Sequence, residues 1–482
     1  MIFQVSSDQP IYQQTFDAFK GAILRGELAA GAKLPSSRKQ AETLGISRNT
    51  VLLAYDQLIA EGYAETKQGS GTFVREDLTL PSSQGSLDKV EMLAPNLSAY
   101  SRAAVSINPG QPHAYPTSAS PLPYDLRYGL ISFDVKLMTQ WKRHLAKATQ
   151  HLPFNYGDVQ GYLGLRQSLS EYLKQHRGVT CTAEQIIITG GSQQALYLSA
   201  RAVLEQGDGV LLEDPCYQGA SQIFSAQGLR IISAQIDSEG IVIPQEPTQS
   251  IKLAYTTPSH QFPSGTVMSL QRRLELLEWA KNNSVYILED DYDSEYRYEG
   301  KPIPAIHGMD THGCVIYMGT FSKTLFPSLR IGFVVLPDAL VKPFRAIKWL
   351  IDRQNAALEQ VALSSFIGEG QFERHIRRTR KQHAKNRQVL LEALEKHFGD
   401  RIEIVGSNAG IHLVVWFKQL SAKLEQTVLE KSQEAGVGVY PISPYYRQKP
   451  KRLGFLIGYT SLTANHMSAA VSRLAKVIAE FS

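Results

Sequence analysis

The chain has 482 residues, a formal net charge of +5 and 43% hydrophobic residues, which indicates more than one domain and excludes a strongly basic or acidic protein. Its three cysteines, Cys181, Cys216 and Cys314, have neither metal-site spacing nor the density of a disulfide framework. Residues 1–8 lack the basic start and apolar core of a secretory leader, and nothing implies a membrane span. We therefore expect a cytoplasmic protein with no bound metal.

The N-terminal part carries the pattern of three helices. Apolar residues recur at helical spacing between Ile11 and Arg25, and Gly26 ends that run. Residues 34–45 predict a short helix that ends at glycine, and Ser47 is a suitable cap for a helix running to about residue 61. A short helix, a glycine turn and a capped helix together predict a helix-turn-helix.

Residues 63–74 form two alternating runs around a glycine-rich turn, which predicts a β-hairpin. Over roughly residues 10–76 the chain resembles the winged helix-turn-helix of GntR-type transcription regulators. The resemblance implies that Arg48 and Asn49 read base edges, that Arg38 holds phosphate, and that the other DNA-binding residues are Thr50, Gln68 and Gly69.

Charge supports this interpretation only locally. Residues 1–77 hold eight basic and nine acidic side chains, so for any single arginine the sequence favours an ordinary solvated surface charge. Between residues 33 and 48, however, four cations face only Glu42. Residues 77–105 mix proline, serine and glycine without a long periodic pattern, which predicts a linker between a DNA-binding domain (1–76) and a larger domain (106–482).

Two apolar strands in the larger domain end in turns with binding potential. Residues 186–196 predict a strand, a glycine pair and a helix start, where free backbone amides, Ser192 and Gln193 can bind an anion. Residues 209–217 predict a second strand, after which Tyr217 can stack on a flat ring. A plain loop and a buried core tyrosine are the alternatives.

A third strand, residues 285–293, ends abruptly in carboxylates. An acid at that position can pair with a pyridine nitrogen and keep it protonated, and Tyr292 can donate to a ring phenolate. A metal site or a simple acidic loop are the alternatives for this cluster alone.

Residues 319–333 place one lysine among small hydroxyl residues, with an arginine seven positions later. Pyridoxal 5'-phosphate (PLP) needs an amine for its aldehyde, which Lys323 offers, and hydroxyls and a fixed cation for its phosphate, which Thr320, Ser322 and Arg330 offer. The isolated motif is also consistent with a solvated turn.

In this order and spacing, the elements from residue 106 to the C-terminus resemble the fold-type-I aspartate aminotransferase superfamily. The resemblance implies an α/β fold with a large and a small PLP-binding domain. It also implies that Asp290 pairs with the pyridine nitrogen, Tyr292 with the phenolate, Lys323 with the aldehyde and Arg330 with the phosphate. Tyr156 resembles the tyrosine that these enzymes lend to a neighbour's phosphate, which implies a homodimer.

Two departures make ordinary transamination doubtful. Where such enzymes carry an asparagine on the ring hydroxyl, this chain has Phe262, so His260 or Gln261 is expected to substitute. The usual carboxylate-binding arginine is replaced by an apolar run around Leu456, and Arg447 or Arg452 is the candidate substitute for an effector.

As a whole, the chain resembles the MocR/GabR-type regulators. That resemblance implies a transcription regulator that binds operator DNA and senses a small amine or amino acid, or PLP itself, through aldimine exchange at Lys323. Catalytic turnover would then be absent or vestigial. The alternative is an active aminotransferase with a DNA-binding appendage.

Overall fold

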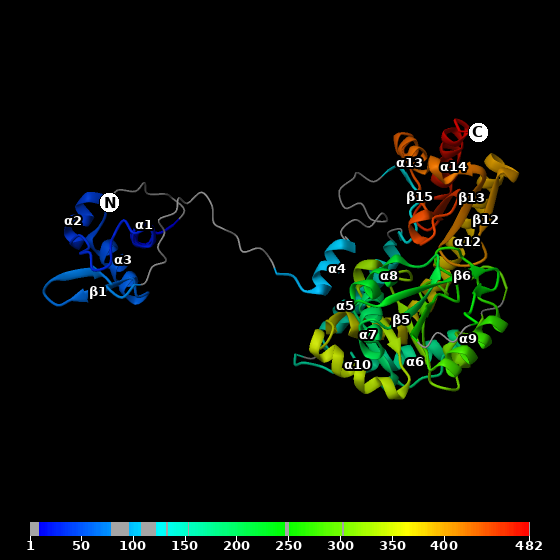
Figure 1. Ribbon diagram of the computed structural model, residues 1–482, viewed down its shortest axis with the longest axis horizontal. Coiled ribbons are helices and arrows are strands. Elements are labelled where there is room, and N and C mark those ends of the chain that lie inside the picture. The colour runs from blue at the N-terminus through cyan, green and yellow to red at the C-terminus, as the bar shows by residue number, and fades with distance from the viewer. Residues whose placement is uncertain are drawn as a thin grey trace. The chain divides into compact units, whose positions relative to one another are not determined.

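The computed structural model describes residues 9–78, 96–107, 122–131, 134–152, 154–245, 250–300 and 303–481. They belong to two compact units, residues 1–96 and 97–482, which are described separately (Figure 1). Residues 79–95 of the predicted linker lie outside the described residues, and its end forms helix α4 (Ala99–Ile107), which contacts α8. No helix in the described part of the chain is long and apolar enough to cross a membrane.

The first unit is a winged helix-turn-helix. Its elements are α1 (Ile11–Leu24), α2 (Ser37–Leu44), α3 (Arg48–Ala60) and the antiparallel pair β1 (Ala64–Lys67) and β2 (Gly71–Val74). Ser36 and Ser47 cap α2 and α3 by accepting the amides of Lys39 and Thr50. Gly45 ends α2 with φ 65°, a left-handed conformation that favours glycine.

The second unit is built on an eight-stranded sheet in the order β4-β11-β10-β9-β8-β5-β6-β7. β11 is antiparallel to both neighbours and β7 is antiparallel to β6, whereas the other neighbours are parallel. The strands are β4 (Ile186–Thr189), β5 (Gly209–Asp214), β6 (Arg230–Asp237), β7 (Gly240–Ile241), β8 (Ile251–Thr256), β9 (Tyr286–Asp291), β10 (Val315–Thr320) and β11 (Gly332–Val335).

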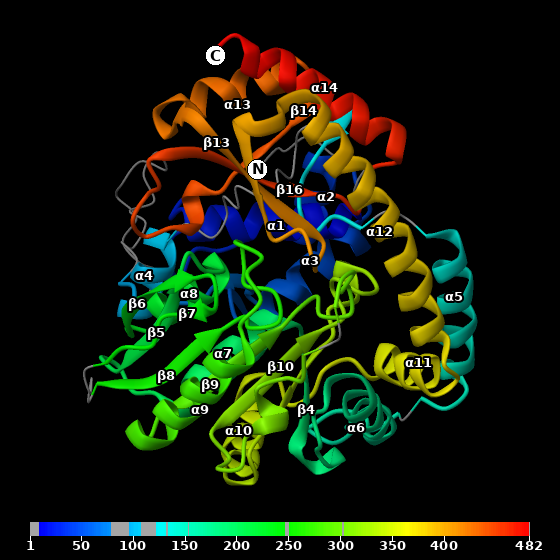
Figure 2. The ribbon, with the colours of Figure 1, turned by 90° about the vertical axis from the view of Figure 1, so that its right-hand side faces the viewer.

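Helices cover both faces of this sheet, which explains the continuous apolar runs of its strands (Figure 2). Ile187 packs in the core with α7, α8 and α10, while its neighbours Ile186 and Ile188 pack in another core with α5, α6 and α11. The helices are α5 (Val135–Thr149), α6 (Leu163–Arg177), α7 (Ser192–Val203), α8 (Gln218–Ala226), α9 (Leu270–Asn283), α10 (Asp338–Ile351) and α11 (Ala357–Gly368).

The long helix α12 (Gln371–Phe398) leads from α11 into a smaller domain (Figure 2). Its antiparallel sheet has the order β12 (Ile402–Val405), β13 (His412–Ser421), β16 (Arg452–Gly458) and β15 (Tyr440–Pro441). Helices α13 (Glu425–Glu434) and α14 (Ala464–Ala479) share its apolar core. β3 (Tyr124–Asp125) pairs with β14 (Val437–Gly438), so an early segment of the unit joins its last domain.

Candidate functional site

The predicted cofactor residues lie at or just beyond the carboxyl ends of parallel strands. Asp290 is the next-to-last residue of β9, and Tyr292 comes directly after that strand. Thr320 is the last residue of β10, and Ser322 and Lys323 follow the strand. Parallel strands deliver their carboxyl ends to one edge of a sheet, which is where ligands bind in open α/β folds.

Asp290 is buried, and its two oxygens have different environments. Oδ2 accepts a hydrogen bond from Tyr255 Oη at 2.8 Å, whereas Oδ1 is buried without a hydrogen-bond partner among the described residues. Burial raises the pKa of Asp290 to about 7, with the charges of Asp291 and Asp293 adding to the effect. An unpaired buried acceptor at the end of β9 fits a protonated pyridine nitrogen, so the residues present fit PLP.

The buried Asp290 predicts a pH-dependent stability of the cofactor-free protein. Between its ordinary pKa and about 7, the folded chain keeps a proton on Asp290 that the unfolded chain has lost. The free energy of unfolding should therefore fall as the pH rises, by up to about 1.4 kcal/mol per pH unit from this group. Asp290→Asn removes this contribution and leaves the other buried acids in place.

Urea unfolding of both cofactor-free proteins near pH 5 and pH 7 measures the difference. We expect the wild type to lose stability relative to Asp290→Asn over that interval. Parallel pH profiles of the two proteins would contradict the assignment of a proton to Asp290.

An anion site forms where α7 begins. The N-cap of α7 is Gly191, which has no side chain to cap the first turn, so the first backbone amides of the helix are available to an anion. Arg330 donates to Gly190 O at 2.7 Å and has φ 53°, and Thr320 Oγ1 and Ser322 Oγ are 3.1 Å apart. These groups have the chemistry to bind a phosphate.

Two glycines give this anion site its shape. Gly191 has φ +98°, and a Cβ there would lie 3.0 Å from the guanidinium of Arg330. A Cβ on Gly332 would lie 2.9 Å from Gly191 Cα. Neither position has room for a side chain.

Lys323 Nζ lies 5.3 Å from the ring centroid of Tyr128. Tyr128 was not predicted as a site residue, because it belongs to no local motif in the sequence. Tyr217 lies before α8, and its hydroxyl accepts from Gln193 Nε2 at 2.9 Å, so the predicted stacking residue and one predicted anion-binding residue contact each other. Tyr128, Tyr217 and Tyr292 pack around Phe262 in one aromatic cluster.

The structure distinguishes between Gln261 and His260, the two candidates to replace the asparagine that binds the ring hydroxyl in aminotransferases. Gln261 is buried, and its Nε2 donates to Glu213 Oε2 at 3.0 Å and to Pro215 O at 2.8 Å, while its Oε1 accepts from Ser264. Its amide therefore holds the loop. His260 Nδ1 instead lies 3.0 Å from Tyr292 Oη and 3.0 Å from Asp293 Oδ2, so only His260 contacts a predicted cofactor residue.

His260, Asp293 and His412 also form the one group of possible metal ligands found among the described residues. Their candidate ligand atoms all lie within 4.8 Å of one another, and all three residues are buried. His412 was not expected from the sequence, because it lies far along the chain from the motif that contains His260, whereas Asp293 belongs to the acidic run of residues 285–293, for which a metal site was one alternative.

The arginines proposed for an effector carboxylate have other partners. Arg447 is exposed, and its guanidinium donates to Ile231 O at 3.1 Å. Arg452 pairs with Glu403 at 2.8 Å. Leu456 is buried with Phe262 and Trp416, so the face that replaces the usual arginine is apolar.

Tyr156 makes no contact with the predicted cofactor residues of its own chain in the part of the chain that the structure describes. It is 79% exposed, next to Phe154 at 98%, and the guanidinium of Arg353 lies 5.9 Å from its ring centroid. Further exposed apolar side chains on α10 are Trp349, Leu350 and Ile351. Such a surface is typical of an interface with another chain.

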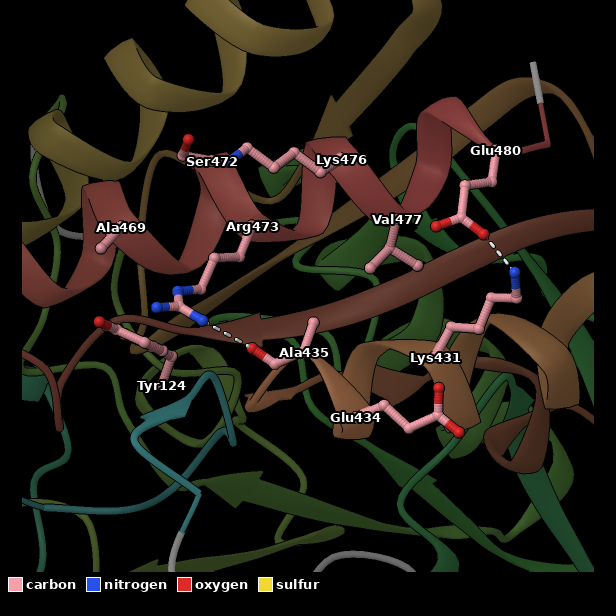
Figure 3. Close-up of a pocket in the computed structure, with 10 residues that line it drawn as sticks. All are labelled: Tyr124, Lys431, Glu434, Ala435, Ala469, Ser472, Arg473, Lys476, Val477 and Glu480. Atoms are coloured by element: carbon pink, nitrogen blue, oxygen red, sulfur yellow. Dashed lines mark hydrogen bonds and ion pairs between the residues drawn. The ribbon is translucent and has the colours of Figure 1, made fainter.

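A separate groove of about 630 Å³ lies beside α13 and α14 (Figure 3). Lys431 pairs with Glu480 across it, and Arg473 donates to the backbone carbonyl of Ala435. None of its ten lining residues is among the predicted site residues, so the groove does not belong to the cofactor site.

In the first unit, the predicted DNA-binding residues are mostly solvent-accessible. Arg38 on α2 and Arg48 and Asn49 at the start of α3 are exposed, and Arg48 Nε donates to Ser37 Oγ at 3.2 Å. Thr50 is half-buried, with its hydroxyl 2.8 Å from that of the cap Ser47. Gln68 and Gly69 are exposed in the turn between β1 and β2.

Comparisons with known proteins agree with both halves. Residues 11–74 match the bacterial regulatory proteins of the gntR family, and residues 125–474 match the aminotransferase class I and II family. Over 83% of this chain and 97% of the other, the fold is similar to the crystal structure of kynurenine aminotransferase from Pyrococcus horikoshii, with a TM-score of 0.68 and 27% identity. The predicted fold class is thus confirmed.

Relatives that match almost the whole chain are regulatory proteins of similar overall length. The chain is 35% identical to a probable rhizopine catabolism regulatory protein MocR of Rhizobium meliloti, over 98% of this chain and 95% of that protein. It is 29% identical to the pyridoxine biosynthesis transcriptional regulator PdxR of Corynebacterium glutamicum, over 93% and 91% of the two chains. The chain therefore belongs to the MocR/GabR-type transcription regulators, in which a GntR-type winged helix-turn-helix precedes a fold-type-I aminotransferase domain.

Proposed function

We propose that this regulator binds operator DNA through its first unit and holds PLP on Lys323 in its second, where it senses a small amine or amino acid, or PLP itself. The names of the relatives support a regulatory role, and one of them regulates pyridoxine biosynthesis. The observation that carries the cofactor assignment is the buried, unpaired Oδ1 of Asp290.

The residues of the site would contact different parts of the cofactor. Asp290 would hold the ring nitrogen and Tyr292 the ring oxygen, and Tyr217 would lie against the ring. Arg330 and the first amides of α7 would hold the phosphate, with the remaining anion contacts from Ser192, Gln193, Thr320 and Ser322. When bound, PLP supplies an aldehyde carbon that forms an imine with an amine.

Sensing would exchange one amine for another. Lys323 would hold the aldehyde of PLP, and the bound group would supply a carbon at which the amine of an effector would replace that of Lys323, which would leave as a free amine. No electrons are lost and no water is consumed. The exchange would alter DNA binding because the effector binds one arrangement of the protein better than another.

The apolar surroundings of Phe262 and Leu456 favour a sensor over an enzyme, because neither side chain can bind a substrate carboxylate or the ring oxygen. The test is to add amines to the PLP-loaded protein and follow its visible absorbance, its operator affinity and 2-oxo acid production. A spectral change with altered operator affinity and no sustained 2-oxo acid supports the sensor. Sustained production would establish the alternative, an active aminotransferase with a DNA-binding appendage.

The exposed surface that contains Phe154, Tyr156 and Trp349 supports a homodimer in which Tyr156 reaches the phosphate site of the partner. The double change Phe154→Ser and Tyr156→Ser should weaken the dimer by several kcal/mol, because two large side chains would lose a buried interface. Light scattering over a dilution series measures the change in the dimer dissociation constant.

Leu270 and Leu274 on α9 are also exposed and make a matched control. The change of both to serine should leave the dimer intact if the aromatic surface is the interface. Equal dissociation of both double variants, or of neither, would reject the assignment.

A further inference from the structure

The outer side of α12 carries a row of cations. Between Glu373 and Glu392 this helix has no acidic residue. Five exposed cations of the helix recur three or four residues apart, so they lie on one side of it, opposite the buried Phe372, Ile376 and Leu390. They are Arg374, Arg377, Arg378, Lys381 and Lys385.

Helix α5 continues this cationic side (Figure 2). Asp134, the N-cap of α5, accepts a hydrogen bond from Arg378, and Lys147 in its last turn pairs at 2.7 Å with Glu369, two residues before α12. Both ends of α5 therefore adjoin the first half of α12. α5 contains no acidic residue, and its exposed cations are Lys136, Lys142, Arg143 and Lys147.

Positive charge is concentrated on these two helices. α5 and residues 374–385 of α12 expose ten cations, Arg380 included, which we call the cationic face. The acids bonded to this face or beside it on α12 are Asp134, Glu369 and Glu373. Ten cations and three carboxylates leave a surplus of seven positive charges, whereas the whole chain has a net charge of only +5. The remainder of the chain is therefore slightly acidic.

Folding of the second unit does not explain this row of cations. Arg377, Arg380, Lys381 and Lys385 have no ion pair or side-chain hydrogen bond within the described part of the chain. Like charges three or four residues apart destabilise a helix. The row therefore lowers the stability of α12 in the free protein, and a polyanion bound to it would remove that repulsion.

The first unit indicates which polyanion is present. This chain belongs to a family with a GntR-type winged helix-turn-helix, yet its residues 1–77 hold eight basic and nine acidic side chains. Proteins that bind duplex DNA draw a large share of their affinity from cations that neutralise phosphates. Residues 1–77 have no surplus of such cations, whereas the cationic face has one. Because both units belong to one chain, DNA held by the first unit has a high local concentration for the second.

We propose that the cationic face binds the phosphates of duplex DNA next to the operator, without reading bases. This proposal rests on the proposed binding of operator DNA by the first unit. The row on α12 from Arg374 to Lys385 is about 17 Å long at 1.5 Å per residue, which corresponds to about five phosphates of one strand at 3.4 Å each. Arginine and lysine are the side chains that commonly contact these phosphates.

The salt dependence of DNA binding tests the proposal. The triple variant Arg377→Gln, Lys381→Gln and Lys385→Gln removes three cations without removing a described contact. We expect the slope of log affinity against log salt to become shallower by about 0.9 for each cation that contacts a phosphate. Affinity at low salt should fall by about tenfold or more, and equally for operator and unrelated duplex DNA. Fluorescence anisotropy of the full chain over a series of salt concentrations measures both quantities.

Two further variants locate the effect. A second triple variant removes the same charge from α5, and it should also make the slope shallower. Its changes are Lys136→Gln, Lys142→Gln and Arg143→Gln. The matched control removes three exposed cations outside the cationic face, and it should keep the wild-type slope. Its changes are Lys252→Gln, Lys281→Gln and Lys418→Gln.

Unchanged slopes in both variants of the cationic face would overturn the proposal. An equally shallow slope in the control would do the same, because it would show an effect of net charge alone. Weaker binding to vesicles of phosphatidylserine and phosphatidylcholine, with unchanged binding to both duplexes, would identify a lipid surface as the partner instead. Failure of the wild type to bind either duplex would remove the proposed DNA binding itself, together with this proposal.

Discussion

Lys323→Ala should abolish the covalent complex with PLP. Lys323 Nζ is the amine that lies against Tyr128, just beyond the end of β10, so its removal leaves the aldehyde without a partner there. We expect no borohydride-reducible adduct, a loss of the response to effector, and unchanged basal affinity for operator DNA. Intact mass after reduction measures the adduct, and an operator titration measures the affinity.

Surface lysines also react with aldehydes, so the comparison needs a matched variant. Lys342 on α10 is exposed and lies outside the cofactor residues, and Lys342→Ala should keep the full adduct. An undiminished adduct in Lys323→Ala would refute the covalent assignment. Loss of operator binding in that variant would point to a structural role for Lys323.

Arg48→Ala should weaken specific binding to the operator by about 1 to 3 kcal/mol, the usual contribution of an arginine that pairs with a guanine. Arg48 is exposed at the first turn of α3, and its contact with Ser37 orients the side chain from the preceding helix. Fluorescence anisotropy with operator and with unrelated DNA, at several salt concentrations, separates specific binding from nonspecific binding.

Arg25 is a suitable control because it is exposed at the end of α1 and pairs with Glu27. Arg25→Ala should leave the ratio of specific to nonspecific affinity unchanged. An equal loss on operator and unrelated DNA in Arg48→Ala would assign Arg48 to phosphate instead of a base.

Local signals in the sequence were sufficient for much of the fold. The predicted cap Ser47 accepts the amide of Thr50, and the helix between residues 34 and 45 ends at left-handed Gly45. The acidic end of residues 285–293 is indeed the end of a buried strand, because an apolar run between two helical layers has few alternatives.

Contacts between distant segments could not be predicted in the same way. Tyr255 binds Asp290 from the neighbouring strand, and Tyr128 reaches Lys323 from a segment almost two hundred residues earlier. Gln261 was an equal candidate to His260 until the structure showed its amide bonded to Glu213 and Pro215. These outcomes depend on side-chain direction in the folded chain, which residue type and spacing do not specify.

The close approach of Gly191 and Gly332 has a consequence for how related sequences diverge. A Cβ at Gly332 would press on the backbone of Gly191 in the anion site, and a Cβ at Gly191 would press on Arg330. If the second unit holds PLP as proposed, a related regulator that does not bind PLP has no need for glycine at these two positions. Alanine at both positions in a relative would therefore indicate a regulator that responds to a different ligand.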